Sequence, residues 1–105
     1  MRAPAAGFDW DDGNRDKCQR HGLSIEDTEH VLAHAETLIV PDERNSRVEP
    51  RFLAIGRTAI GRYAMVVFTP RKKANDVFLR PISARYMHRK EIEKYAQEIS
   101  RAQNG

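Results

Sequence analysis

The spacing of apolar residues predicts two short helices near the start of the chain. A helix over about 25–35 follows from apolar positions that recur every three or four residues, at Ile25, Thr28, Val31, Leu32 and Ala35. Ser24 and Asp27 frame its start as a variant of the capping box, with Asp where Glu or Gln is usual. A shorter helix over about 12–20 is expected after Asp11 and Asp12, whose carboxylates suit a helix start, and Gly22 stops it.

Four apolar runs further along the chain predict strands. They cover 37–40, 52–57, 63–69 and 77–83, separated by a polar loop over 41–50, a hairpin loop over 58–61 and a turn over 71–76. Pro81 lies inside the last run and cannot donate to a ladder of hydrogen bonds. That strand is therefore expected either at the edge of the sheet or with a bulge at Pro81.

One amphipathic helix is predicted near the end of the chain. Ile92, Tyr95, Ala96 and Ile99 repeat at i, i+3, i+4 and i+7, which indicates a helix over about 87–102 with Tyr95 in the core. The element order ααββββα predicts an α+β fold, in which an antiparallel sheet carries the helices on one face. Trp10 is expected to anchor the core from the N-terminal side.

Length and composition limit the class of protein. At 105 residues and 40% hydrophobic content the chain makes one domain, expected over 7–105 after a flexible tail over 1–6. No apolar run approaches the ~18 residues of a membrane span, and the N-terminus lacks the apolar segment of a signal peptide. The one cysteine, Cys18, cannot form an internal disulfide, which fits a cytoplasmic protein. Its basic neighbours could lower its pKa, but a small packing residue is the more ordinary role.

Basic residues are concentrated in one stretch of the chain. Between Arg51 and Lys90 there are ten Lys or Arg side chains and one acidic residue, Asp76. The fifty residues before this stretch hold six basic and eleven acidic side chains. Positive charge gathered in one region attracts polyanions, of which a phosphate backbone is the commonest. The alternative is a solvated basic surface without a partner.

Three blocks of residues resemble one known family. They are Phe8-Asp-Trp-Asp11 followed by Arg20-His-Gly-Leu-Ser24, then Arg51-Phe-Leu-Ala-Ile-Gly-Arg57 with Gly61-Arg62, and finally Arg80-Pro-Ile-Ser-Ala-Arg-Tyr86 ahead of a helix with Glu91 and Tyr95. In order and spacing they resemble the BrnT family, the toxin half of a type II toxin–antitoxin pair. The resemblance runs from about Gly7 to Tyr95.

This resemblance implies a fold, an activity and partners. The fold would be that of the RelE-like ribonucleases, and the activity a metal-independent cleavage of RNA that arrests translation, with no cofactor. A BrnA-like antitoxin would neutralise the toxin. That antitoxin would also form dimers and bind DNA, so the toxin would meet DNA only through the antitoxin complex.

The chemistry of such a cleavage points to a histidine. Without a metal, the reaction needs a base for the 2′-OH, a cation for the charge on the phosphate and an acid for the leaving 5′-oxygen. No metal site is expected, because the acidic residues are spread over caps and helix faces and no His/Cys pair has ligand spacing. His21 is the first candidate for base or acid, since imidazole titrates near neutrality. Its place before Gly22 equally suits a helix-ending residue bonded to free carbonyls.

The remaining candidates concern the phosphate and the second proton. Arg57, Arg80 and Arg85 lie on or at the ends of predicted strands, where their guanidinium groups could converge on one phosphate. Tyr86 and His88 follow the last strand. Tyr86 could stack on a base or donate its hydroxyl, and His88 could supply the second titrating group. Each of the five could instead be an ordinary surface or packing residue of a half-solvated sheet.

A second set of basic residues is expected to bind the RNA backbone rather than to do chemistry, namely Lys17, Arg20, Arg62, Arg71, Lys72 and Lys73. Two other functions would use the same charges. The chain could be a nucleic-acid-binding module without catalysis, or an interaction protein whose basic face meets an acidic partner. Cleavage of RNA by the purified chain separates the enzyme from both alternatives.

Overall fold

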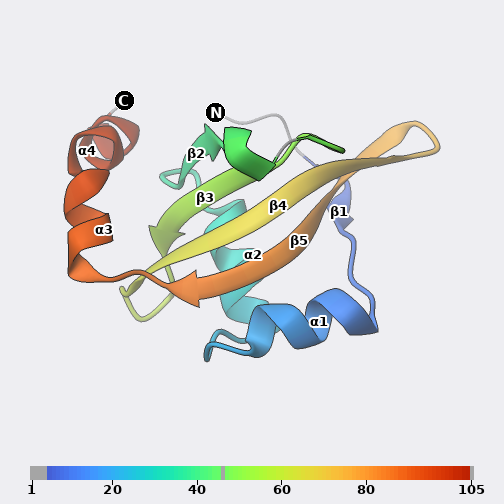
Figure 1. Ribbon diagram of the computed structural model, residues 1–105, viewed down its shortest axis with the longest axis horizontal. Helices are drawn as coiled ribbons and strands as arrows, with labels where there is room; N and C mark the ends of the chain where they lie inside the picture. Colours follow the sequence, from blue (N-terminus) through green and yellow to red (C-terminus); the bar gives the residue numbers. More distant parts are fainter. Residues whose placement is uncertain (1–4, 46, 105) are drawn as a thin grey trace.

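The computed structural model describes residues 5–45 and 47–104, which form an α+β fold (Figure 1). In this part of the chain a five-stranded sheet is joined by four α-helices and one short 3-10 helix. The elements in order are β1 (Gly7–Phe8), α1 (Asp12–Gln19), α2 (Ile25–Ala33), β2 (Leu38–Pro41), η1 (Glu43–Asn45), β3 (Phe52–Arg57), β4 (Tyr63–Lys73), β5 (Asp76–Tyr86), α3 (Arg89–Lys94) and α4 (Ala96–Asn104).

The sheet is an antiparallel meander of β2 to β5, with β1 added in parallel along the outer side of β5. The predicted α+β class is confirmed, but the predicted count of four strands is wrong because of β1. This strand only pairs Gly7 with Phe78 and Phe8 with Leu79, and two residues are too few to carry a periodic pattern. Of the tail predicted over 1–6, residues 1–4 lie outside the described residues, while the Ala6 backbone N–H donates to the Val77 carbonyl.

The strands β4 and β5 are longer than predicted. Each has eleven residues, so the turn expected over 71–76 is confined to Ala74 and Asn75. Ion pairs with distant carboxylates hold two of the three basic side chains of this segment, since Lys73 lies 3.0 Å from Asp9 and Arg71 lies 3.3 Å from Glu49. The two strands consequently project beyond β3 as a ribbon (Figure 1).

A bulge lies in β5 next to Pro81. The register shifts there, because Val67 pairs with Ser83 while Phe68 pairs with Pro81, which leaves one extra residue on β5. The carbonyl of Pro81 accepts a hydrogen bond of 2.8 Å from the buried Asn14 side chain of α1. Of the two alternatives expected at Pro81, an edge or a bulge, the structure has a bulge, and α1 is attached to the sheet at this point.

The first two helices begin at the predicted caps. The Asp11 side chain accepts a hydrogen bond from the Asn14 backbone N–H, and the Ser24 side chain accepts one from that of Asp27. Both caps are complete capping boxes. Between the helices Gly22 has a φ of +95°, which a residue with a side chain rarely adopts, and it turns the chain away from α1.

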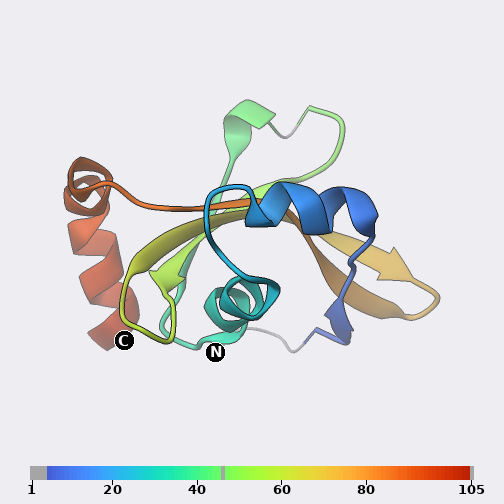
Figure 2. The same ribbon diagram turned by 90° about the horizontal axis from the view of Figure 1, so that it is seen from below.

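Two buried clusters lie on opposite faces of the sheet. Neighbours along β3 alternate between them, since Ala54 belongs to the cluster beneath α1 and α2, and Ile55 to the cluster with Ile99 of α4. Figure 2 shows α2 on one face, with α3 and α4 standing at the end of the sheet. The prediction that all helices share one face is therefore wrong. Trp10 packs against the first cluster and Tyr95 against the second, as predicted.

The single helix predicted over 87–102 is divided into α3 and α4 at Tyr95, whose φ of −103° and ψ of 8° are not helical. Ile92 and Tyr95 pack against the second cluster, and Ile99 is buried in it. The change of direction lets both short helices place apolar side chains on a twisted sheet. The spacing of those residues is the same in one helix and in two, so the sequence pattern does not reveal the break.

Candidate functional site

A hollow of about 100 Å³ brings His21 and Arg85 together on one surface. Its other lining residues are Met65, Val67, Ser83 and Ala84. The register of the sheet explains this set, because Met65 pairs with Arg85 and Val67 with Ser83 on neighbouring strands. His21 reaches the same hollow from the turn after α1 and is exposed to solvent. The structure therefore joins the first histidine candidate to one of the three arginine candidates.

Arg85 is held by a carboxylate. Its guanidinium donates two hydrogen bonds to Glu91, of 2.7 and 2.6 Å, and a third of 3.3 Å to the carbonyl of Tyr86. The hydrogen bonds from Arg85 lower the pKa of Glu91 from 4.5 to about 2, and the same contact raises the pKa of Arg85. Both groups are thus charged near neutral pH. The Arg85 side chain remains 41% exposed, so part of the guanidinium faces solvent.

Arg80 lies beside a second hollow, of about 310 Å³, that also receives Lys17 and Arg51. The Arg80 guanidinium lies 2.7 Å from the Asp11 carboxylate and 3.6 Å from Asp9, and its side chain is only 21% exposed. The pKa of Asp11 is lowered, first by the hydrogen bond from the Asn14 backbone N–H and second by the hydrogen bond from Arg80. The same contact with Asp11 raises the pKa of Arg80. The positive charge of Arg80 is consequently compensated by the carboxylates of Asp9 and Asp11.

Arg57 lies apart from these hollows. It lines two others, which it shares with His34 and Glu36 at the end of α2. Its guanidinium carbon is 5.4 Å from the ring centre of Tyr63. In the hollows formed by residues 5–45 and 47–104 that are described above, Arg57, Arg80 and Arg85 each line different ones, so these hollows do not bring the three guanidinium groups together on one phosphate as the sequence predicted.

Tyr86 and His88 follow Arg85 along the chain and differ in exposure, since Tyr86 is partly buried and His88 is exposed. The Tyr86 ring packs against the first cluster and is covered by the Arg62 guanidinium, whose carbon lies 3.7 Å from the ring centre. His88 is exposed just before α3, and its backbone N–H donates a 3.0 Å hydrogen bond to Glu91. His88 is therefore linked to Arg85 through one shared carboxylate.

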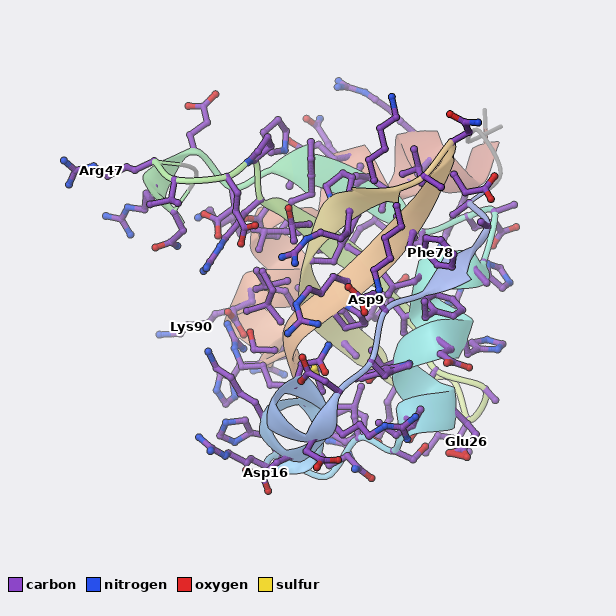
Figure 3. All side chains as sticks on the ribbon, turned by 90° about the vertical axis from the view of Figure 1, so that its right-hand side faces the viewer. Asp9, Asp16, Glu26, Arg47, Phe78 and Lys90 are labelled. Atoms are coloured by element: carbon purple, nitrogen blue, oxygen red, sulfur yellow. The ribbon has the colours of Figure 1, made fainter. Side chains whose placement is uncertain are left out.

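The residues expected to bind the RNA backbone differ in how far their charge is compensated. Arg20 lies 3.0 Å from Asp16, Arg71 is paired with Glu49, and Lys73 is paired with Asp9. Figure 3 shows Asp9 beside the ribbon of β4 and β5. Lys17, Arg62 and Lys72 are exposed, and no carboxylate of the described residues lies within ion-pair distance of them.

Sequence reasoning did not single out several residues that shape the site. Ser83, Met65 and Val67 line the hollow, and Asn14 fastens α1 to the strand that carries it. The alternation of residues along β4 and β5 could have found the first three once the register was known. Among residues 5–45 and 47–104 there is no group of three or more side chains suited to hold a metal ion. None of the helices in that part is long and apolar enough to cross a membrane.

The fold and these hollows define a small basic α+β protein in which a histidine and an arginine line one hollow. The model of one protein family, described as the ribonuclease toxin BrnT of type II toxin–antitoxin systems, matches residues 10–91. The chain therefore belongs to the BrnT family, as its sequence blocks predicted. No curated protein matches the chain. Membership places it among ribonuclease toxins whose activity on RNA is countered by an antitoxin.

Proposed function

We propose that this chain is an endoribonuclease toxin that cleaves RNA without a metal ion and is neutralised by a BrnA-like antitoxin. The observation that carries the proposal is the single hollow lined by His21 and Arg85. A RelE-like fold, arrest of translation and a cytoplasmic location belong to the same proposal. Family membership supports the reaction class, and the hollow supplies two of the groups that the reaction needs.

In the proposed reaction the 2′-oxygen of a ribose attacks the adjacent phosphorus, and the bond from phosphorus to the 5′-oxygen breaks. His21 takes the proton from the 2′-OH or gives one to the leaving 5′-oxygen. The solvent-facing part of Arg85 stabilises the charge that develops on the phosphate oxygens. The products are a 2′,3′-cyclic phosphate and a 5′-hydroxyl. Tyr86 and His88 are the candidates for the second proton transfer.

Glu91 and Arg80 complete the proposed site. Glu91 orients the Arg85 guanidinium through two hydrogen bonds, so less conformational entropy is lost when a phosphate binds. Arg80 and Lys17 lie along a neighbouring hollow and would hold the phosphates on one side of the cleaved bond. Arg57 lies apart and would contact the RNA backbone only at a distance from the chemistry.

The test is cleavage of end-labelled RNA by the purified chain, with and without EDTA. His21→Ala and Arg85→Ala are each expected to lower the rate about 10²–10⁴-fold. His30→Ala is the matched control, because His30 is an exposed histidine on α2 outside the hollow. Loss of cleavage in EDTA contradicts metal independence. Unchanged rates in both variants contradict the site but leave the reaction class intact.

A nucleic-acid-binding module without catalysis is the second candidate. The ion pairs that compensate Arg80 and Arg85 favour it, since both guanidinium groups already have carboxylate partners. Binding of RNA by the wild-type chain without any cleavage would establish this alternative. Growth arrest on expression, relieved by co-expression of a BrnA-like antitoxin, is expected for the toxin and not for the module.

A further inference from the structure

We infer that Arg62, stacked on Tyr86, is a platform for an RNA base next to the cleaved phosphate. The inference rests on the proposed function and adds to it a specificity-determining residue that does not touch the reacting atoms. It is carried by the geometry of the Arg62–Tyr86 contact, by the exposure of Arg62 and by its place next to the hollow of His21 and Arg85.

The contact between Arg62 and Tyr86 is a close stack. The guanidinium carbon is 3.7 Å from the ring centre, whereas the other cation–ring contacts of the described residues measure 5.4 to 5.9 Å. At this distance the guanidinium lies directly over the Tyr86 ring, so the side of it that is turned away from the ring faces outward.

The register of β4 and β5 holds this stack in place. Ala64 pairs with Tyr86, and Arg62 lies two residues before Ala64, so both side chains reach the same face of the sheet. Tyr86 is partly buried and packs against the first buried cluster, which supports the ring beneath Arg62. Arg62 is exposed and has no carboxylate of the described residues within ion-pair distance, in contrast to Arg80 and Arg85. The side of Arg62 that is turned away from Tyr86 is thus open to solvent.

Two segments of the chain place the platform next to the hollow, because each has one residue in the hollow and the next residue at the platform. Tyr86 follows Arg85 on β5, and a Cβ atom on Gly22, the residue after His21, would lie 3.8 Å from the Tyr86 ring. Arg85 and Tyr86 face opposite sides of β5. Beyond Leu79 the outer side of β5 is flanked by α1 and by the turn that carries His21 and Gly22, and not by a strand. A nucleotide that passes beside this turn at the end of β5 would keep its phosphate at Arg85 and lay its base on Arg62.

A guanidinium plane is a suitable surface for a base. Unstacked bases of single-stranded RNA bind aromatic rings and Arg planes alike. The platform therefore selects for a single-stranded RNA with an accessible base beside the cleaved bond. In binding of the base, Tyr86 acts through its ring, which supports Arg62, and this role is separate from the proton transfer proposed for its hydroxyl.

The experiment uses the cleavage site mapped for the wild-type chain in end-labelled RNA. A nonamer around that site is made resistant by a 2′-O-methyl group at the attacking ribose, and each flanking base is removed in turn. For wild-type protein, loss of the base at one flanking position is expected to weaken binding about tenfold. Arg62→Ala and Arg62→Lys should bind the intact nonamer about tenfold more weakly and should no longer respond to loss of that base.

Two controls separate stacking from charge and from folding. Tyr86→Phe keeps the ring and should retain the wild-type binding profile with the resistant nonamer. Arg15→Ala removes another arginine that lies over a ring, 5.9 Å from the centre of Trp10, and should retain the binding profile as well. A response to base removal that persists in Arg62→Ala overturns the platform, as does a wild-type profile in Arg62→Lys, which preserves charge without the plane. If the wild-type chain cleaves no RNA, the proposed function fails first, and the platform fails with it.

Discussion

Arg85 and Glu91 face each other across the turn between β5 and α3, joined by two hydrogen bonds of 2.7 and 2.6 Å. Glu91 also accepts a hydrogen bond from the His88 backbone N–H at the start of α3. One carboxylate thus orients the guanidinium at the candidate site and fixes the position of the following helix. The pair couples the stability of the C-terminal segment to the geometry of the site.

The Glu91 pKa of about 2, below its ordinary 4.5, predicts a specific response to acid. A carboxyl group whose pKa is lower in the folded state contributes stability above about pH 4.5, and the contribution is lost as the pH falls towards 2. Glu91→Gln is expected to reduce the free energy of unfolding by about 1 kcal/mol at pH 7, because the pair is partly screened by solvent. It should also flatten the decline of stability between pH 4.5 and 2. Urea unfolding at several pH values measures both effects.

Glu93→Gln is the control for this prediction, since Glu93 is an exposed carboxylate of the same helix. Its unfolding free energy should follow that of the wild-type chain throughout the acid range. Equal effects of the two substitutions would show that the Arg85–Glu91 pair contributes no more to the free energy of unfolding than the change in net charge does.

Removing the carboxylate beside Arg80 is expected to strengthen RNA binding. In Asp11→Asn the Arg80 guanidinium loses its 2.7 Å partner, so more positive charge faces the hollow that it shares with Lys17. Affinity for single-stranded RNA should rise about threefold at low salt, and the gain should shrink as salt is added. Asp12→Asn changes the net charge equally without a contact to Arg80, and fluorescence anisotropy should register a smaller gain. Equal gains in the two variants argue against a role for Arg80 in binding.

Asn14 is expected to be among the most sensitive polar positions. Its buried side chain donates to the carbonyls of Asp9 and Pro81 and accepts from the Asp11 backbone N–H. Asn14→Asp replaces two donated hydrogen bonds by a charge facing two carbonyl oxygens, at a cost of about 2–4 kcal/mol in unfolding free energy. Gln19→Glu makes the same chemical change on the exposed side of α1 and should cost less than about 0.5 kcal/mol. Chemical denaturation that finds similar losses for both would contradict this role.

Cys18 should be unreactive in the folded chain. It is fully buried, and burial raises its pKa from 9.0 to about 11, which leaves almost no thiolate at pH 8. Iodoacetamide is expected to label the native protein at least a hundredfold more slowly than the protein in guanidinium chloride, as followed by mass spectrometry. Similar rates in the two conditions would mean that the thiol is accessible in the native state.

The local elements were largely predictable because their signals are local. The capping residues Asp11 and Ser24, and the apolar positions of α2, act within one or two turns of the chain. Pro81 indicated an edge or a bulge, because a missing N–H interrupts any ladder of hydrogen bonds in which it lies, and the structure has the bulge. In contrast, β1 and the outer halves of β4 and β5 depend on contacts such as Lys73 with Asp9, which are 64 residues apart.

The candidate site was predictable in kind but not in arrangement. Histidine and arginine were the expected groups, and His21 and Arg85 do line one hollow. Sequence position could not show that Arg57 lies elsewhere, or that Arg62 stacks on Tyr86. Both facts follow from the pairing of β3, β4 and β5, which decides the side chains that share a face.

By itself the amino-acid sequence determined the α+β class, the strands of the meander, the helix caps and the basic character of the region from Arg51 to Lys90. These depend on the chemistry of residues close together along the chain. Only the tertiary structure decided which arginines are compensated by carboxylates and which remain open to a ligand. The physical reason is that charge pairing acts through space over a few ångströms, and strand register, rather than distance along the chain, brings the partners within that range.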